Sequence, residues 1–370
     1  MKHFLYYLYE NLNDATENDY NPRKWLTAQI DPIISDIVCM APHTCNYDDI
    51  AYGYSNEIIE TLIKIGVLRK ENSSLLLNCT VLIEEDYPLI SEHFSYFASH
   101  AADKLENIKK QIYYWIKKIN NGFDPAINLY HILCGTIFDG LFFEYLSLKQ
   151  IVKTSKLQPS GLDYIITIYE DCKLLENFSK KLLCSYNRYQ NGPCIFQSFG
   201  DANGNRKDFY RFITMMQNNY MTNEMIPILQ IWNSIKKDIP KNTLFLELKN
   251  LKETKQCQEK YHQLFSFFRY VNDNNICVPI YSKEDQPIIE KIENIIENTL
   301  FEDFKTALLT SKRIQQLTCS RHGVSLSEVA NELYHIAFGL LNNELVSRKF
   351  VSAPEYFPDE GAYLKSIELI

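Results

Sequence analysis

Glycine and proline are scarce in this chain, with 12 Gly and 13 Pro among its 370 residues. Turn-dense all-β architectures and disordered tails use more of both, because these residues supply the backbone conformations of tight turns and linkers. Hydrophobic residues make up 46% of the chain and charged residues 23%, the balance of a globular protein with a large buried core. The composition therefore predicts a mainly helical protein of about one to three domains.

Paired cysteines are also lacking. None of the ten cysteines belongs to a CxxC motif, and most lie in apolar runs, as Cys79 and Cys134 do. Free thiols buried in a reducing compartment account for this pattern. The apolar stretch FLYYLY near the start is short and is followed by charge at Glu10. We therefore expect neither a signal peptide nor a membrane span, and we expect a cytoplasmic protein.

Sequence motifs of catalysis are missing as well, since GxxxxGK[ST], GxGxxG, HExxH and GxSxG do not occur. The cluster CMAPHTC at 39–45 offers too few ligands for a structural zinc site. The stretch FGDANGNRKDF begins like a calcium loop at Asp201, but it has Arg206 where such a loop needs glycine and Phe212 where it needs glutamate. We therefore expect no catalytic residue, no metal site and no cofactor.

Two phrases occur twice in the chain, about 200 residues apart. LYHILCG at 129–135 returns as LYHIAFG at 333–339, and NCTVLIEEDYPLI at 78–90 has a counterpart in NICVPIYSKEDQPII at 275–289. The segments 78–90 and 275–289 each begin with a short β-rich run. Acidic residues follow it, and then a proline near the start of a predicted helix. Because the order is the same, the sequence predicts an internal duplication with halves 1–190 and 191–370.

Each LYHI phrase lies in a predicted helix with its own start signal. Asp124 and Pro125 are suited to the N-cap and first position of the first helix, and Ser325 with Glu328 forms a capping box for the second. Strand-like runs and turn residues follow each helix. They predict hairpins near 149–170, from strands 149–157 and 162–171, and near 349–369, from strands 349–354 and 362–370.

The stretch 45–83 predicts a short helix, a second helix capped by Ser55 and ended by Gly66, and two strands joined by a turn at 71–74. This pattern, with its wing near 55–83, resembles the winged-helix domains of bacterial regulators. In the second half, a strand is predicted near 275–281, at the position that corresponds to the strands of the first half. The expected fold is mainly α with small β-hairpins (α+β), in tandem duplicated winged-helix-containing halves.

The resemblance implies DNA binding, in which the second helix and the wing carry the contacts. On this basis Lys64, Arg69 and Lys70 are the candidate residues. Two glutamates on the same helix, Glu57 and Glu60, oppose contact with phosphate. The net charge of -8 also opposes a long basic surface but allows a local one. A module used only for packing or dimerisation is the alternative.

The most basic helical stretch is KLENIKKQIYYWIKKIN, which carries two lysine pairs, Lys109 with Lys110 and Lys117 with Lys118. Two helical turns separate the pairs, so they share a face that could follow a DNA backbone. A solvated charged face is the alternative. A weaker basic cluster, SKRIQQLTCSRHG, occupies the corresponding place in the second half.

The repeated phrase also carries His131 and His335, each preceded by a tyrosine, Tyr130 and Tyr334. These four residues could line a ligand pocket, since imidazole binds ligands and metals readily. Histidines that are hydrogen-bonded within an apolar core are the alternative.

Together these patterns predict a cytoplasmic winged-helix transcriptional regulator that binds double-stranded DNA. Its helical region would serve ligand sensing or self-association, with a homodimer as one arrangement, and no membrane partner is expected. Two other functions stay open: a winged-helix protein that docks a peptide or protein, and an enzyme with its site between the halves.

Overall fold

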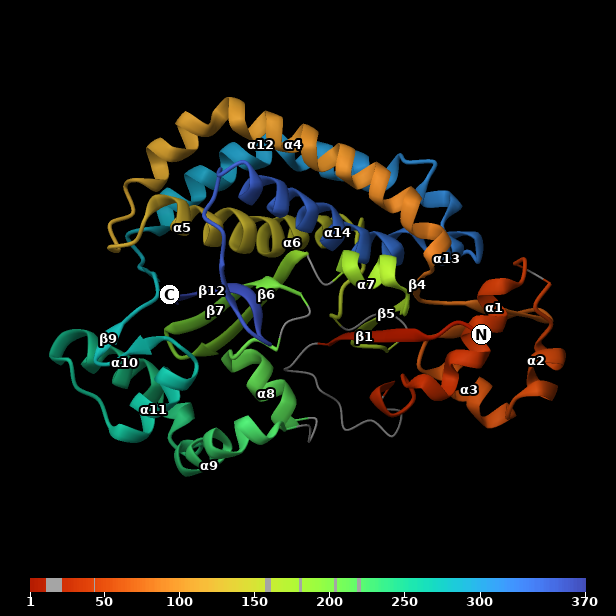
Figure 1. The fold of residues 1–370 in the computed structure, drawn as a ribbon, viewed down its shortest axis with the longest axis horizontal. Coiled ribbons are helices and arrows are strands. Elements are labelled where there is room, and N and C mark those ends of the chain that lie inside the picture. The colour runs from red at the N-terminus through yellow and green to blue at the C-terminus, as the bar shows by residue number, and fades with distance from the viewer. Residues whose placement is uncertain (11–21, 43, 157–160, 180–181, 203–204, 218–220) are drawn as a thin grey trace. The chain divides into compact units, whose positions relative to one another are not determined.

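The computed structural model describes residues 1–10, 22–42, 44–156, 161–179, 182–202, 205–217 and 221–370, and these are mainly helical with small β-sheets, as predicted (Figure 1). His43 of the CMAPHTC cluster and two residues of FGDANGNRKDF lie outside the described residues. The chain divides into two compact units. Unit 1 comprises 1–101, 142–180 and 301–341, and unit 2 comprises 102–141, 181–300 and 342–370. Each unit therefore takes segments from both predicted halves.

Unit 1 begins with the strand β1 (Phe4–Glu10), followed by α1 (Asp31–Cys39), α2 (Tyr47–Gly53), α3 (Asn56–Lys64), β2 (Leu68–Glu71), β3 (Ser74–Leu77) and β4 (Thr80–Leu82). The helices and hairpin predicted over 45–83 are thus present. Ser55 holds the N-cap position of α3, and Gly66 ends the helix with a φ of +83°, a conformation that glycine adopts without strain. Asn46 forms an isolated antiparallel bridge with Ser74.

The sheet of unit 1 has the strand order β1-β5-β4, with β5 (Tyr164–Glu170) antiparallel to β1 and parallel to β4. The predicted hairpin near 149–170 is therefore wrong: residues 149–156 form no strand, and 157–160 lie outside the described residues. Nearly every residue of β5 is buried. Such a continuous apolar run is typical of a central strand with a neighbour on each side. The short helix α7 (Lys173–Ser179) follows it.

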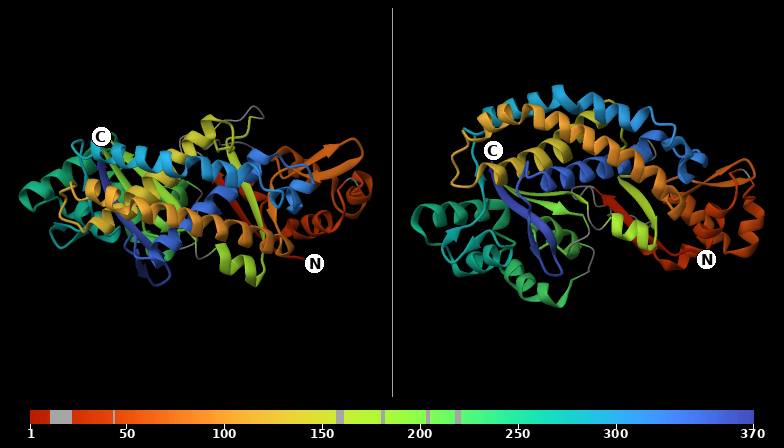
Figure 2. Two further views of the ribbon diagram at one scale, coloured as in Figure 1. Left: turned by 90° about the horizontal axis from the view of Figure 1, so that it is seen from above. Right: turned by 45° about the horizontal axis from the view of Figure 1, so that its top comes forward.

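Parts of three long helices complete unit 1: the first part of α4 (Tyr87–Ile116), the last part of α12 (Gln286–Leu309) and the first part of α14 (Leu326–Ser347). The short helices α6 (Phe143–Leu148) and α13 (Thr318–Arg321) also belong to it. Within this unit α4 lies beside α12, as both views in Figure 2 show. The ring centroids of Phe97 and Phe304 are 4.7 Å apart, and His93 Nε2 lies 2.8 Å from the Ala307 carbonyl oxygen.

Unit 2 contains a sheet with the order β10-β12-β7-β6, whose strands are β10 (Ile280–Tyr281), β12 (Gly361–Leu369), β7 (Cys194–Asp201) and β6 (Leu183–Asn191). The strand β11 (Glu355–Phe357) pairs with β12, so a C-terminal hairpin forms, but not with the predicted partner 349–354. Phe350 and Val351 instead direct their N–H groups to the Leu345 carbonyl at the end of α14 and are buried there.

Each face of this sheet is covered by different helices (Figure 1). One face packs against α8 (Phe209–Gln217), α9 (Ile226–Ile235), α10 (Thr243–Thr254), α11 (Glu259–Phe267) and the hairpin of β8 (Val271–Asn272) with β9 (Asn275–Ile276). The other face packs against α5 (Pro125–Leu129) and the π-helix η4 (Tyr130–Phe142), where Tyr130 and Gly135 contact Phe199.

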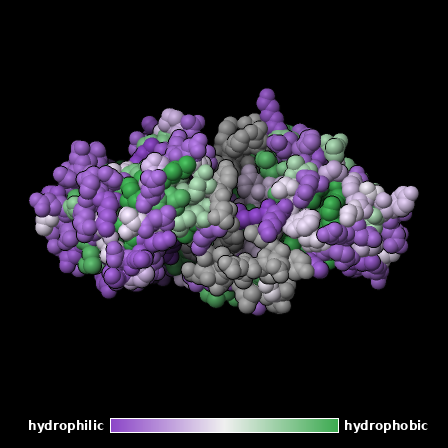
Figure 3. All heavy atoms as spheres, turned by 90° about the horizontal axis from the view of Figure 1, so that it is seen from below, coloured by the Kyte–Doolittle hydropathy of each residue, from purple (hydrophilic) through white to green (hydrophobic). Residues whose placement is uncertain are grey.

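The helix of residues 125–148 is long and apolar enough to cross a membrane by length and composition, which the sequence analysis did not anticipate. Of its most apolar window, 61% is buried within the protein, and a core helix passes the same test. On the face drawn in Figure 3, hydrophobic residues lie in small groups among hydrophilic ones.

Candidate functional site

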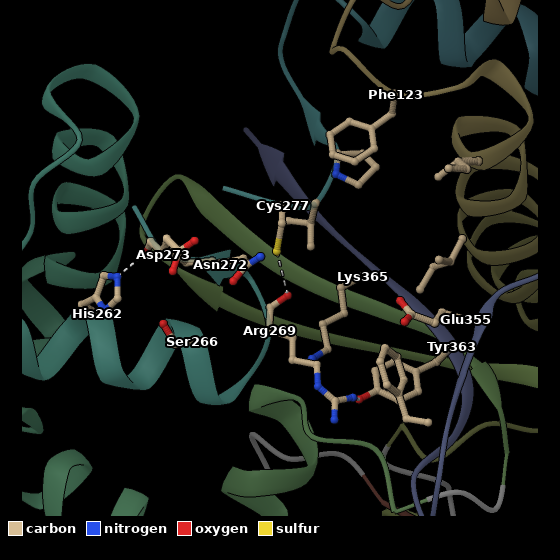
Figure 4. A pocket seen from close by; sticks show the side chains of 16 residues that line it. Phe123, His262, Ser266, Arg269, Asn272, Asp273, Cys277, Glu355, Tyr363 and Lys365 are labelled. Carbon is tan, nitrogen blue, oxygen red and sulfur yellow. Dashed lines mark hydrogen bonds between the residues drawn. The ribbon is translucent and has the colours of Figure 1, made fainter. Parts of the chain in front are cut away.

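A cavity of about 750 Å³ lies within unit 2, and we call it the Lys365 cavity (Figure 4). Its walls come from α11, the hairpin β8–β9, the strands β11 and β12, and the turn before α5. Strand alternation on β12 directs Tyr363 and Lys365 to the same face of the sheet. Gly200 lies opposite Tyr363, and a Cβ at this position would lie 2.6 Å from the Tyr363 Cα, so only glycine allows this approach.

The Lys365 side chain is buried, and its Nζ donates a hydrogen bond to the Phe268 carbonyl. Burial lowers the pKa of Lys365 to about 7, although the charges of Asp208 and Glu360 favour the protonated form. The Nζ also lies 5.1 Å from the centroid of the Tyr363 ring. The site therefore holds an amine that titrates near neutral pH.

Glu360 is a buried carboxylate that contacts the cavity residues Arg269 and Tyr363, and it binds three partners in all. Arg269 contacts it with both terminal nitrogens, at 2.8 and 2.9 Å, and Lys207 Nζ lies 3.2 Å away. The Tyr363 hydroxyl donates a short hydrogen bond to it, and burial followed by this bond raises the pKa of Tyr363. The Arg269 guanidinium also stacks 3.8 Å from the centroid of the Phe357 ring.

Asp208 is the second buried carboxylate of this region. It accepts hydrogen bonds from Ser198 Oγ at 2.7 Å and Asn187 Nδ2 at 3.0 Å, which belong to β7 and β6. Burial opposes its ionisation, but the charges of Arg206 and Arg211 outweigh burial and lower the pKa of Asp208. Glu360 and Asp208 thus each lie beside two cations, Arg269 with Lys207 and Arg206 with Arg211.

A second cavity of unit 2 has a volume of about 570 Å³. It is lined by one lysine that the sequence predicted to contact DNA and by two that it did not. Lys118 lines it with Lys252 and Lys255, and we call it the lysine groove. Lys117 is exposed next to Lys118, and Lys118 Nζ lies 3.9 Å from the centroid of the Trp115 ring. Asn120, Asn121 and Asn275 add amide groups, and the carboxylates Glu284 and Asp285 line the same cavity.

The other predicted lysines of α4 lie farther from this groove. Lys109 Nζ is 3.2 Å from Glu106 and 5.0 Å from the centroid of the Phe350 ring, and Lys110 is exposed. Lys252 and Lys255 were not predicted from the sequence. Lys249 and Lys252 share a face of α10, and Lys255 follows as its C-cap with a left-handed backbone.

In unit 1 the predicted wing residues have internal partners. Arg69 donates to the Leu77 carbonyl at 2.5 Å and to the His322 carbonyl at 2.6 Å. Lys70 Nζ lies 3.4 Å from the centroid of the Tyr47 ring, and Lys64 is exposed at the end of α3. Arg69 thus links the wing to the turn after α13. It lines a polar cavity of about 570 Å³ together with Glu71, Asn78, Lys153, Arg321, His322, Gly323, Ser325 and Glu328.

The predicted histidine pair is divided between the units. His131 is buried in unit 2 with Ser366 Oγ 3.4 Å from its Nδ1, and burial lowers its pKa to about 3. His335 is half-buried in unit 1, with its Nδ1 2.8 Å from the Asn331 carbonyl oxygen and its ring stacked on Tyr9. Tyr130 and Tyr334 are fully buried among aromatic rings. The four residues therefore do not lie together within one unit.

All ten cysteines are free thiols, and no group of three or more potential metal ligands occurs in the part of the chain that the structure describes. Comparison with protein-family models, with curated proteins and with solved structures found no match for this chain.

Proposed function

We propose that the chain is a tandem duplication of one winged-helix-containing module, with copies 1–190 and 191–370, as the repeated phrases predict. The order of elements supports this. In the first copy three helices precede a hairpin, a short strand, two long helical segments and a longer strand, in the order α1, α2, α3, β2–β3, β4, α4, α5–η4–α6 and β5. The second copy has α9, α10, α11, β8–β9, β10, α12, α14 and β12 in the matching order. It also contains β7 and α8 before α9, α13 before α14, and β11 before β12.

Strand pairing supports the same duplication. Thr80 on β4 is opposite Thr167 on the parallel strand β5, and Ile280 on β10 is opposite Ile367 on the parallel strand β12. Each pair is related to the other by a shift of about 200 residues, the repeat spacing of the sequence. Arg69 and Arg269, which show the same shift, each line a cavity beside their hairpin.

The first copy supplies the elements of a winged helix in order. The helix α1, the bridge residue Asn46, the helices α2 and α3, and the hairpin β2–β3 follow one another as they do in such domains. In the second copy α9, α10 and α11 with β8–β9 take the corresponding positions. These modules are the basis for proposing a regulator that binds double-stranded DNA in the cytoplasm, where its ten free thiols would stay reduced.

The observation that carries DNA binding is the lysine groove. Lys118, just after α4, lines the groove together with Lys252 and Lys255 of the second module, and exposed Lys117 is its neighbour in the chain. A group of lysines attracts the phosphates of a DNA backbone. In the first module exposed Glu57 and Glu60 of α3 repel phosphate, and Arg69 is held by backbone carbonyls. We therefore assign the DNA contact to the second module rather than to the predicted first wing.

Fluorescence anisotropy with a labelled duplex at low salt tests this assignment. The double variant Lys252→Gln/Lys255→Gln should bind about tenfold more weakly and should lower the salt slope by about two units. Lys236→Gln/Lys237→Gln removes the same charge from exposed positions at the end of α9 and serves as the control. Equal affinity of both variants, or no binding by the wild type at micromolar protein, would reject the proposal.

Docking of a basic peptide is a second candidate, and the first module carries it. Asp48, Asp49, Glu57 and Glu60 are exposed there, and Tyr52 is 96% exposed. An exposed aromatic ring among carboxylates suits a cationic partner. A lysine-rich peptide should bind the wild type and should lose affinity in Tyr52→Ala, whereas indifference to this change would argue against docking.

A further inference from the structure

We propose that the Lys365 cavity binds a small organic anion, a carboxylate carried on an aromatic body. Its volume of about 750 Å³ suits a drug-sized molecule. The cavity lies wholly within unit 2 and shares two wall residues, Phe123 and Val278, with the lysine groove.

The polar side of the cavity offers donors for a carboxylate. Arg269 uses three N–H groups on Glu360 and on the Tyr363 hydroxyl, out of the five that a guanidinium carries. Its side chain keeps 37% exposure. Ser266 adds a hydroxyl oxygen that is buried and has no hydrogen-bond partner. A ligand carboxylate could accept from both residues and satisfy this hydroxyl.

The charge deep in the cavity favours an anion. Arg269 lines the cavity and shares the buried carboxylate of Glu360 with Lys207, so one carboxylate balances only part of the charge of two cations. Two further carboxylates of the cavity, Asp273 and Glu355, are exposed to solvent. Water screens exposed charges more strongly than buried ones, so the inner cations decide the sign.

The remaining walls favour an aromatic body. Phe123 lies on one side of the cavity in Figure 4, and Phe357 lines it beside Arg269. Ile127 and Val278 complete an apolar surface. Flat rings pack well against such walls, while the polar groups fix their orientation.

Isothermal titration with 1-naphthoate and with its neutral amide, 1-naphthamide, tests the charge requirement on the wild-type protein. We expect one site that binds the acid at least about tenfold more tightly than the amide. Equal affinities, or no saturable binding of the acid at about 10 mM, would overturn the proposal.

Alkylation of Cys277 locates the bound molecule, because this exposed thiol lines the cavity. Naphthoate should slow the reaction of Cys277 with iodoacetamide, as followed by mass spectrometry. The exposed thiol of Cys39 in unit 1 is the internal control and should react unchanged. Protection of both thiols, or of neither, would place the ligand elsewhere and reject the site.

Two variants separate the charge of the site from its shape. Arg269→Gln removes the principal donor, and Ile127→Trp fills the cavity without changing its charge. Each should weaken naphthoate binding about tenfold or more. Arg188→Gln removes a half-exposed arginine that contacts Glu368 on the same sheet, and it should bind like the wild type. Unchanged affinity in a folded Ile127→Trp protein would exclude this cavity.

Discussion

Lys365 on β12 lies directly opposite Ser198 on β7, and the Ser198 hydroxyl donates a 2.7 Å hydrogen bond to buried Asp208. Lys365 and Ser198 are neighbours across the two strands, and Asp208 is bound to the sheet through Ser198. The amine is buried so deeply that desolvation dominates its ionisation and lowers its pKa to about 7. A charged lysine at this position therefore lowers the stability of the fold.

Replacing Lys365 by methionine should stabilise the protein at neutral pH. Below pH 7 the amine is protonated in both the folded and the unfolded chain, and burying the charge destabilises the fold by at most about 5 kcal/mol. Between pH 7 and 10.5 only the unfolded chain keeps the proton, so the wild type gains stability as pH rises. Urea unfolding should show an advantage for the variant at pH 7 that shrinks toward pH 10. An advantage independent of pH would contradict this account.

Replacing His131 by leucine should make the protein less sensitive to acid. Burial lowers the pKa of His131 to about 3 from an ordinary 6.5, so between these values only the unfolded chain binds the proton. The wild type should lose about 3 kcal/mol from this group between pH 7 and pH 4. The variant should lack this loss, whereas His100→Gln, at an exposed position, should keep it. Equal acid dependence in all three proteins would show that His131 does not control it.

Replacing Arg69 by glutamine should lower stability without changing DNA affinity. The side chain bonds to the carbonyls of Leu77 and His322, so its loss should reduce the free energy of unfolding by about 1–2 kcal/mol. Lys312→Gln, at an exposed position of the same unit, should leave stability unchanged. Denaturant melts and anisotropy titrations of both variants provide the comparison. A stable Arg69→Gln protein that loses DNA binding would restore the first wing as the contact surface.

Separate chains of residues 1–180 and 181–370 should fold only together. Unit 1 contains 301–341 and unit 2 contains 102–141, so each half lacks a segment that completes its core. Phe304 and Leu333, for example, are fully buried in unit 1 but belong to the second half. Co-expression should give a one-to-one complex with the circular dichroism of the intact protein. Cooperative unfolding of either half alone as a monomer would contradict this dependence.

The amino-acid sequence determined the features that depend on neighbouring residues. Gly66 ended α3 as predicted, and the hairpin over 68–77 formed around its polar turn, because turn conformations and helix ends are set by a few adjacent residues. The helical character of the LYHI segments was readable from the spacing of their apolar side chains. The spacing did not distinguish the π-helix at 130–142 from the α-helix that carries the second phrase.

Only the tertiary structure decided which distant segments meet. The apolar run of β5 fits a hairpin as well as a central strand, and its pairing with β1 and β4 depends on contacts across the sequence. From the sequence alone, Lys365 would be expected at the surface. It is buried because β12 pairs with β10 on one side and β7 on the other. Lys118 meets Lys252 and Lys255 only after folding. Local periodicity carries no information on such pairings, because burial and charge depend on which surfaces the fold brings together.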